Sequence, residues 1–566
     1  METGNYLKEI IGYKEIYGND ETLDEASQLI GRIPTASLLY KIAHINIYLY
    51  LSHPGSGGQL LQVEILNSFL KFCPPALIAK FKAVIKKVET EGNWPTIFWE
   101  HSNLLFYDLV FKNQTPGIVG HLSDTQTEQI LKAYLIVNSI TNNRFSITKE
   151  EVDEAAAKGE LESILIPHFI YQRDYISNLD FSNQINRAIL FFDYLENTPE
   201  YQPYIADYYT ALHIKSYKEL LYNILSIWTQ AEIDGPVGNR RAQISFSTLK
   251  NLVNLDYIES LAINKELSGY QSDLSFTALR EHPLYKIGPT EYIILDINFL
   301  TDQLYKAQVF AFKKFIKSKG YQGNFLSVKG KDFMEDIYLR SIMKRCFPQF
   351  VKLNGDQATK NDNTELCDYY VRDQSKVLLM EFKDILLNAD IKATANKTAI
   401  DKELHKKFSA NQKNSAKGIT QLYNAVKYLE NSDLINDITD RNTPLDIYPV
   451  IVYTDQSFGH EGINKMFNKS FQMLLAGHTF QNVKVNGVTF INLNYFEVHE
   501  AYLSSGTINL YELIKKYQEY VSEQNQSTTT FEVFSRAYFR ENNVVDIKEN
   551  KLLKENMAII MPEATL

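Results

Sequence analysis

The sequence predicts two halves of different fold class. A mostly α-helical N-terminal half precedes a C-terminal half with an α/β fold, in which a mixed sheet is flanked by helices. In residues 1–270 the apolar residues recur at three- and four-residue spacings, which is typical of helices with one buried face. From about residue 276 short apolar runs alternate with helical segments, which indicates an α/β sandwich.

Residues 1–270 are expected to form an accessory domain. The sequence leaves open whether this domain binds a partner, senses a ligand or has only a packing role. The clearest helical spacing is found in segments 36–51, 126–140 and 215–228. Breaks between helices are predicted at stretches that contain glycine or proline, namely 53–58, 114–117, 197–203 and 234–239.

The remainder of the chain is predicted to contain three further parts. Residues 271–325 read as a β-hairpin followed by a helix, an element that bridges the two halves. Residues 326–505 read as helix, hairpin, helix and two more strands, which together form one α/β domain. Residues 506–566 contain one clear helix, at 508–524, and then a polar tail for which the sequence predicts nothing.

Composition excludes several classes of protein. The three cysteines, Cys73, Cys346 and Cys367, are too few and too scattered for a disulfide framework, and charges interrupt the N-terminus where a signal peptide is apolar. A cytoplasmic location is therefore expected. No apolar run approaches the roughly 18–20 residues of a membrane span. A net charge of −10 argues against a basic coat over the whole surface, but it allows a local basic patch.

The apolar stretch VLLMEFKDILL, residues 377–387, carries two charges at its centre. Glu381 and Lys383 are two residues apart, so on a strand they point to the same face. The preceding ELCDYYV also reads as a strand, and RDQSK reads as the turn between them. A hairpin that is symmetric about Gln374–Ser375 sets Asp368 opposite Glu381. Two carboxylates so close repel each other unless a cation lies between them, and oxygen ligands suit Mg²⁺ or Mn²⁺.

The helix before this hairpin supplies a third acid. Glu335 heads a stripe with Leu339, Ile342 and Cys346, whereas its neighbour Asp336 lies on a charged stripe. Glu335 is therefore the predicted functional residue. In the helix after the hairpin, Gln421 lies at the edge of a buried stripe that is formed by Ile419, Leu422, Val426 and Leu429.

This ordered set resembles the PD-(D/E)XK nuclease superfamily over about 170 residues. The resemblance implies a restriction-endonuclease-like core in residues 326–505. It implies that Asp368 and Glu381 are metal ligands, that Lys383 is the catalytic lysine, and that Glu335 and Gln421 are supporting residues on the helices. One departure is Cys367, which stands where the nominal motif has proline.

The resemblance also implies a mechanism. A Mg²⁺ or Mn²⁺ ion held by Asp368, Glu381 and the carbonyl of Phe382, with Glu335 in support, would polarise a phosphoryl oxygen and activate water. Lys383 would orient or deprotonate that water and stabilise the charge that develops on the phosphate. The blander alternative is that Glu381 and Lys383 are an edge-strand pair that keeps a sheet soluble.

A basic segment follows the predicted catalytic strand. It carries a local charge of about +5 and is predicted either to track a phosphate backbone or to form a solvated insertion. Its lysines are Lys392, Lys397, Lys402, Lys406, Lys407, Lys413 and Lys417.

The leading functional hypothesis is a metal-dependent nuclease that cleaves nucleic acid, with DNA favoured. The resemblance suggests an effector in bacterial restriction or anti-phage defence, with a protein partner bound through the helical half. One alternative is a non-catalytic subunit that binds nucleic acid or protein on the same fold. Another is a complex in which the nuclease is a minor activity. The sequence leaves the oligomeric state open.

Overall fold

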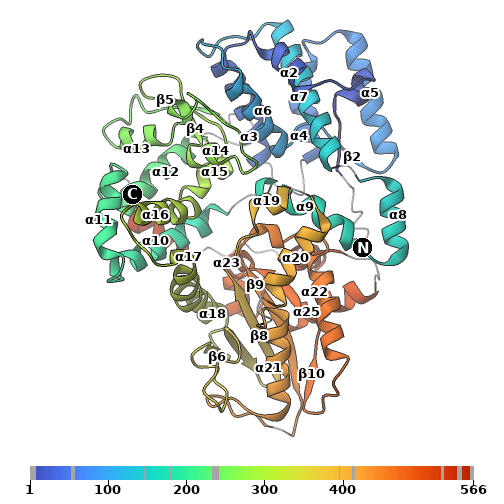
Figure 1. Ribbon diagram of the computed structural model, residues 1–566, viewed down its shortest axis with the longest axis vertical. Coiled ribbons are helices and arrows are strands. Elements are labelled where there is room, and N and C mark those ends of the chain that lie inside the picture. The colour runs from blue at the N-terminus through green and yellow to red at the C-terminus, as the bar shows by residue number, and fades with distance from the viewer. Residues whose placement is uncertain are drawn as a thin grey trace. The chain divides into compact units, whose positions relative to one another are not determined.

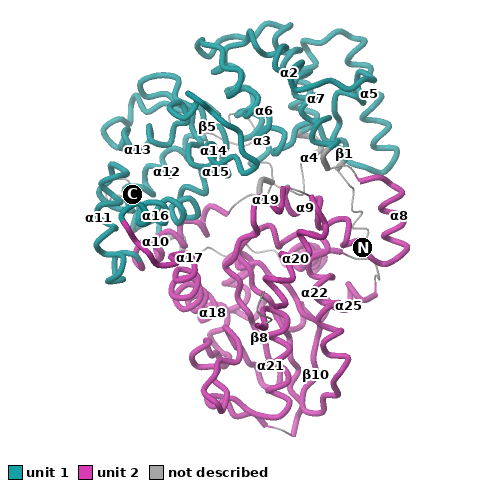
Figure 2. Tube along the Cα trace, in the orientation of Figure 1, with its two compact units in different colours: residues 1–146, 195–319, 556–566 teal, residues 147–194, 320–555 magenta. Residues whose placement is uncertain are grey.

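The computed structural model describes residues 8–51, 58–145, 147–176, 180–231, 241–393, 395–410, 415–440, 442–523, 528–542, 544 and 551–560. It divides the chain into two compact units, each built from segments that are separated in the sequence (Figure 2). The first comprises Met1–Ser146, Leu195–Lys319 and Asn556–Leu566, and the second comprises Ile147–Tyr194 and Gly320–Glu555. Within the described ranges, no helix has both the length and the apolar character needed to cross a bilayer.

The first unit is mostly helical, as the spacing predicts. Its elements are β1 (Lys8–Ile10), α1 (Tyr13–Tyr17), α2 (Leu23–Ile30), α3 (Thr35–Leu51), α4 (Gly58–Leu70), α5 (Pro75–Thr90), β2 (Trp94–Thr96), α6 (Glu100–Lys112), α7 (Asp124–Phe145), α11 (Gln202–Ala211), α12 (Tyr217–Ala231), β3 (Gln243–Ser245), α13 (Leu255–Ser260), η1 (Ile263–Lys265), α14 (Thr277–Glu281), β4 (Leu284–Lys286), β5 (Glu291–Ile294), α15 (Ile297–Asp302) and α16 (Lys306–Ser318). Helices α3 and α7 cover the first two predicted segments, and α12 covers the third from Tyr217 onward.

The predicted hairpin and helix at 271–325 are present as β4, β5, α15 and α16, but they do not form a separate bridge. Strand β5 pairs with both β4 and β3, which gives a three-stranded antiparallel sheet in the order β3-β5-β4. Local sequence predicts the hairpin because its strands are adjacent in the chain. The distant strand β3 that incorporates it into the first unit carries no such local signal.

The second unit contains the predicted α/β fold. Its elements are α8 (Lys149–Lys158), α9 (Glu162–Ile176), α10 (Phe181–Asn197), α17 (Phe325–Val328), the π-helix η2 (Lys329–Leu339), α18 (Arg340–Cys346), β6 (Val351–Asn354), β7 (Tyr369–Asp373), β8 (Lys376–Lys383), α19 (Ala389–Ala393), α20 (Lys397–Phe408), α21 (Ile419–Asn431), β9 (Leu445–Tyr453), η3 (Gln456–Phe458), α22 (Ile463–Leu475), β10 (Val483–Val485), β11 (Thr489–Asn492), α23 (Leu493–Val498), α24 (Glu500–Ser504), α25 (Leu510–Glu523), α26 (Phe531–Glu541) and α27 (Lys551–Ile560). The last residues of α10 and of α27 belong to the first unit.

The strands of the second unit form a mixed six-stranded sheet (Figure 1). Its order is β10-β9-β8-β7-β6, with β11 also paired to β9. Strand β7 is antiparallel to both β6 and β8, whereas β9 runs parallel to β8 and to both β10 and β11. A central strand that is covered by helices on both faces is expected to be largely apolar, and residues 377–380 of β8 fit this description.

Helices cover both faces of this sheet. On one face Leu379 of β8 belongs to the same hydrophobic cluster as Leu422 and Val426 of α21, and Figure 1 shows α21 in front of β8 and β9. On the other face Tyr511 of α25 packs edge-on against Tyr448 of β9, with 5.4 Å between ring centroids. Glu381 and Lys383 share the α21 face with Leu379.

Residues 147–194 are predicted to belong to the helical half, but the structure places them in the second unit. Ile166 and Ile170 of α9 lie in the hydrophobic cluster of the sheet. Arg187 of α10 forms a buried ion pair with Glu497 of α23, with Nε–Oε1 and Nη2–Oε2 distances of 2.9 and 2.8 Å. Helical spacing shows that a helix has an apolar face, but it does not show which part of the protein packs against that face. The prediction that these helices belong to the N-terminal half is therefore wrong.

The described residues of the C-terminal part contain two helices, α26 and α27, for which the sequence gives no prediction. Helix α25 corresponds to the predicted helix at 508–524, and α26 follows it with Phe531, Phe534 and Ser535 buried. The carboxylate of Glu532 accepts hydrogen bonds from Asn492 N (2.7 Å) and Tyr453 Oη (3.2 Å) at the ends of β11 and β9. Residues 506–555 are thus part of the second unit.

Candidate functional site

Glu381 and Lys383 lie on an internal strand of the sheet, β8. Strand β8 has β7 on one side and β9 on the other, so the edge-strand alternative for Glu381 and Lys383 is wrong. Glu381 is only 1% exposed, and its Oε2 accepts a hydrogen bond of 3.0 Å from Lys383 Nζ. A buried carboxylate is costly unless it is paired or protonated, which makes this pair the first indication of a site.

The β7–β8 hairpin has the predicted register. Tyr369 pairs with Met380 and Asp373 pairs with Lys376, which makes the hairpin symmetric about the two-residue turn Gln374–Ser375. Strand β7 begins at Tyr369, so Asp368 lies one residue before it. Its Oδ2 accepts a hydrogen bond of 2.6 Å from the backbone N of Phe382. The Asp368 carboxylate is therefore fixed beside the end of β8 that carries Glu381 and Lys383.

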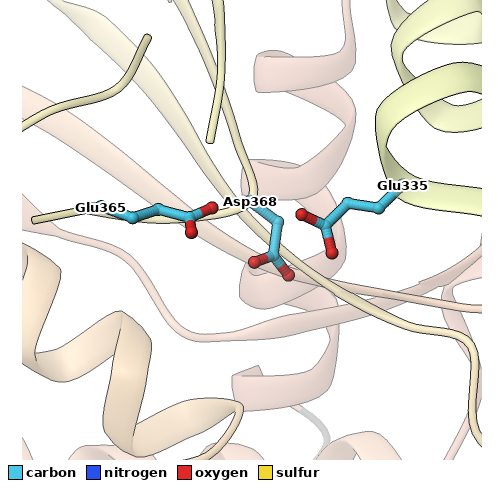
Figure 3. Close-up of side chains that lie close together, drawn as sticks. All are labelled: Glu335, Glu365 and Asp368. Carbon is cyan, nitrogen blue, oxygen red and sulfur yellow. The ribbon is translucent and has the colours of Figure 1, made fainter. Parts of the chain in front are cut away.

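Glu335 reaches Asp368 from the helix before the hairpin (Figure 3). One oxygen each from Glu335, Glu365 and Asp368 lie within 4.8 Å of one another. We call these three residues the carboxylate cluster. Figure 3 shows the Asp368 carboxylate between the other two, which point toward it from opposite sides.

The helix that carries Glu335 is partly a π-helix, where the sequence predicts continuous α-helical spacing. The Glu335 side chain is 14% exposed and that of Asp336 35%, so the structure agrees with the choice of Glu335 as the inward acid. Both ends of η2 are tied to the domain. Lys329 Nζ donates to Asp384 Oδ2 (2.5 Å) just after β8, and Tyr338 Oη donates to Glu497 Oε1 (2.5 Å). π-Helical turns occur frequently at functional sites.

Glu365 is the member of the cluster that sequence reasoning missed. It lies in the loop between β6 and β7, and it forms an isolated antiparallel bridge with Thr359. A Cβ atom on Gly355 would lie 1.9 Å from Glu365 Oε1, so the absence of a side chain at position 355 leaves room for this carboxylate. Its one sequence signal is an acid three residues before Asp368, which carries no helical or strand pattern.

Burial and repulsion between the carboxylates favour their protonated forms. Burial, followed by the charge of Asp368, raises the pKa of Glu335 to about 7, although Lys331 opposes the shift. Burial and Asp368 likewise raise the pKa of Glu381 to about 8, against the opposing effect of Lys383. Such shifts are typical of sites that bind a cation or transfer a proton.

Lys383 remains a cation in this setting. Burial lowers its pKa, but the charges of Glu381 and Asp368 outweigh burial, so the net shift is upward. Its Nζ also lies 3.4 Å from Oε1 of Gln421. The lysine is therefore suited to hold a fixed positive charge at the site.

Gln421 is placed by the start of α21. Its Oε1 accepts a hydrogen bond of 2.8 Å from the backbone N of Gly418, which closes the first turn of the helix. The predicted buried stripe is confirmed, since Ile419, Leu422, Val426 and Leu429 are all buried. Gln421 thus lies at the edge of that stripe and faces Lys383. Phe382 is buried on the opposite face of β8, and its backbone N–H donates a hydrogen bond to Asp368 Oδ2.

The predicted phosphate-binding lysines do not form one uniform patch. Lys392 is 4% exposed and its Nζ lies 3.3 Å from Ser457 Oγ, so its assignment to a phosphate contact is wrong. A count of charges along the chain cannot tell a buried amine from a solvated one. Lys413 lies outside the described residues, and Lys417 is half-buried.

The remaining lysines lie on α20. Lys397, Lys402 and Lys406 are exposed, whereas Lys407 is half-buried. Lys406 and Lys407 pair with Glu403 at 3.6 and 3.3 Å. The helix is held to the domain by its buried apolar face of Ile400, Leu404 and Phe408.

The arrangement gathers oxygen ligands and a fixed ammonium at one end of the central strands. Glu335, Asp368, Glu381, Lys383 and Gln421 are linked through contacts or through shared charge effects, and Glu365 joins them. Carboxylate oxygens suit hard divalent cations such as Mg²⁺ and Mn²⁺. No protein-family model, curated protein or solved structure matches this chain.

Proposed function

We propose that this protein is a Mg²⁺- or Mn²⁺-dependent nuclease that hydrolyses phosphodiester bonds of nucleic acid, with DNA favoured as the substrate. One observation carries the proposal: Asp368 and the charged pair Glu381–Lys383, separate in the sequence, lie at one end of the β7–β8 hairpin beside the helix acid Glu335. This is the arrangement that the resemblance to the PD-(D/E)XK superfamily implies.

The donor set fits a divalent cation. The carboxylate cluster and Glu381 provide only oxygen ligands, and burial together with repulsion by Asp368 raises the pKa values of Glu335 and Glu381. A divalent cation among them would remove this repulsion. When bound, such an ion polarises a phosphoryl oxygen and increases the acidity of water.

The residues of the protein would bind the cation, orient the attacking water and stabilise the developing charge. Asp368, Glu335 and Glu365 would hold the cation, and Glu381 would both contribute an oxygen and fix the position of Lys383. The charged ammonium of Lys383 would orient the attacking water and stabilise the negative charge that develops on the phosphate. Since the pKa of Lys383 is raised, orientation and charge stabilisation suit it better than proton abstraction. The exposed lysines of α20 would contact the nucleic-acid backbone.

A cleavage assay tests this proposal. Plasmid, linear duplex and single-stranded DNA, and RNA, are incubated with Mg²⁺, Mn²⁺ or EDTA. Wild type is compared with Lys383→Met and Glu381→Gln, and with Lys376→Met as a matched control at the other end of β8. Cleavage that requires metal, is lost in the two site variants and persists in the control is the expected result. Equal cleavage by all variants would mean that the site is elsewhere.

One observation favours the non-catalytic alternative. Lys383 pairs with Glu381 and Lys331 pairs with Glu335, so part of the negative charge is compensated without any metal. Nucleic-acid binding that is unchanged by EDTA, with no cleavage under any condition, would support a binding subunit. In either case the helical first unit is a candidate for partner binding, and restriction or anti-phage defence is the biological setting that the resemblance suggests.

A further inference from the structure

Lys331 contacts the carboxylate cluster from within η2. Its Nζ forms a close ion pair with Glu335 Oε1, four residues later in the chain. The same ammonium lies 4.0 Å from Glu365 Oε1 and 3.8 Å from Asp336 Oδ1. Lys331 therefore places one positive charge between two members of the cluster.

This lysine differs from the other lysines around the site. Lys329 and Lys383 are largely buried, and they pair with the carboxylates of Asp384 and Glu381, respectively. The side chain of Lys331 is 43% exposed, so its ammonium can move into solvent without opening the core. A lysine is a compact charge on a flexible stem, which suits a contact that forms and breaks.

The carboxylates that Lys331 neutralises, those of Glu335 and Glu365, are also carboxylates that a metal would need. An ammonium paired with them therefore competes with a divalent cation for the same negative charge. The two positive charges would also repel each other at this distance. The cluster therefore has two competing counter-ions, one built into the chain and one from solution.

We propose that Lys331 is an internal counter-ion of the carboxylate cluster, which a divalent cation displaces and which then contacts a phosphate of the substrate. This inference rests on the proposed function, since it assumes that the cluster binds a metal. The displaced ammonium stays attached to η2, within a side chain's length of the ion. Cation and phosphodiester would then bind cooperatively, because both favour the same displaced state of Lys331.

The first test measures metal binding without nucleic acid. Mn²⁺ is titrated by calorimetry into wild type, into Lys331→Met, and into Lys344→Met, which removes an exposed lysine of α18 as a matched control. Loss of the competing ammonium is expected to tighten Mn²⁺ binding about tenfold in Lys331→Met. The control should bind as wild type does.

Thermal melting gives an independent readout. In EDTA the Lys331→Met variant should melt below wild type, since the cluster has lost its counter-ion. At saturating Mn²⁺ this difference should disappear, because the cation has taken the place of the lysine in both proteins.

The second test concerns the phosphate contact. Binding of a short duplex DNA is measured with and without Mn²⁺ in Lys383→Met, which would not cleave, and in the double variant Lys331→Met/Lys383→Met. Mn²⁺ should enhance DNA binding several-fold less in the double variant.

Two results would overturn the inference: Mn²⁺ binding that is no tighter in Lys331→Met than in wild type, or no Mn²⁺ binding to either protein. In the first case metal-dependent cleavage by wild type would leave the proposed function intact. In the second case the cleavage assay decides the proposed function separately.

Discussion

Binding of a divalent cation to the carboxylate cluster should depend steeply on pH. The metal-free protein is partly protonated on these two acids at neutral pH, since the pKa of Glu335 is raised to about 7 and that of Glu381 to about 8. The cation needs the ionised forms, so binding must release these protons and becomes tighter as the pH rises. With these two pKa values the affinity should rise on the order of several hundredfold between pH 6 and pH 8.

Calorimetry in buffers of different ionisation enthalpy counts the released protons directly. At pH 7 Mn²⁺ binding to wild type should release about 1.4 protons, the sum of the protonated fractions of the two acids. Glu381→Gln has only one of these acids, so it should release about 0.5 proton and its affinity should rise only about tenfold over the same pH range. An affinity that does not change between pH 6 and pH 8 would refute this reasoning, because the acids would then be ionised without a metal.

Three further predictions concern other residues. Gly355→Ala should displace Glu365 and weaken Mn²⁺ binding several-fold, whereas Gly477→Ala, where an added Cβ meets no atom within 4 Å, should not change the titration. Burial raises the pKa of Asp296 to about 6. The protonated carboxyl therefore stabilises the folded state below about pH 4, and this contribution to the free energy of unfolding is lost as the pH rises through 6. Urea unfolding at pH 4 and pH 7 should show this loss, up to about 3 kcal/mol, as a change in the stability difference between wild type and Asp296→Asn, since the other acids titrate in both proteins. If α20 follows a nucleic-acid backbone, Lys397→Met/Lys402→Met should reduce the slope of the logarithm of the DNA-binding constant against the logarithm of salt concentration by about 1.8. Lys392→Met should lower the melting temperature and leave that slope unchanged, and equal slopes in all three proteins would exclude α20 from the interface.

Local patterns predicted the parts of the site that lie close together in the sequence. The register of the β7–β8 hairpin followed from two alternating strands and a short turn, which place Asp368 beside the end of β8. The choice of Glu335 over Asp336 followed from a buried stripe that continues through Leu339 and Ile342. Both inferences use the fixed geometry of a single element or of one hairpin.

What the sequence did not predict depends on contacts between distant segments. Glu365 joins the cluster because a loop returns past Gly355 to Asp368, and no periodicity describes a loop. The assignment of Lys392 is wrong because this residue is buried and contacts Ser457, 65 residues later in the chain. The packing of α9 against the sheet is also a contact between distant segments. The sequence does not predict it, because the apolar face of a helix does not specify which surface it packs against.

The discontinuous second unit has a consequence for synthesis of the chain. Helices α8 and α9 leave the ribosome before the whole of Leu195–Lys319 and before the sheet strands that complete their packing. Domains tend to fold as units in the order in which they are made, but here the early helices must wait with apolar residues such as Ile166 uncovered. Strand β8 likewise lacks its parallel neighbour β9 until residue 453 has been made. A nascent chain that stops short of this point contains the acids but not the sheet that holds them, so the site can assemble only after β9 has been made.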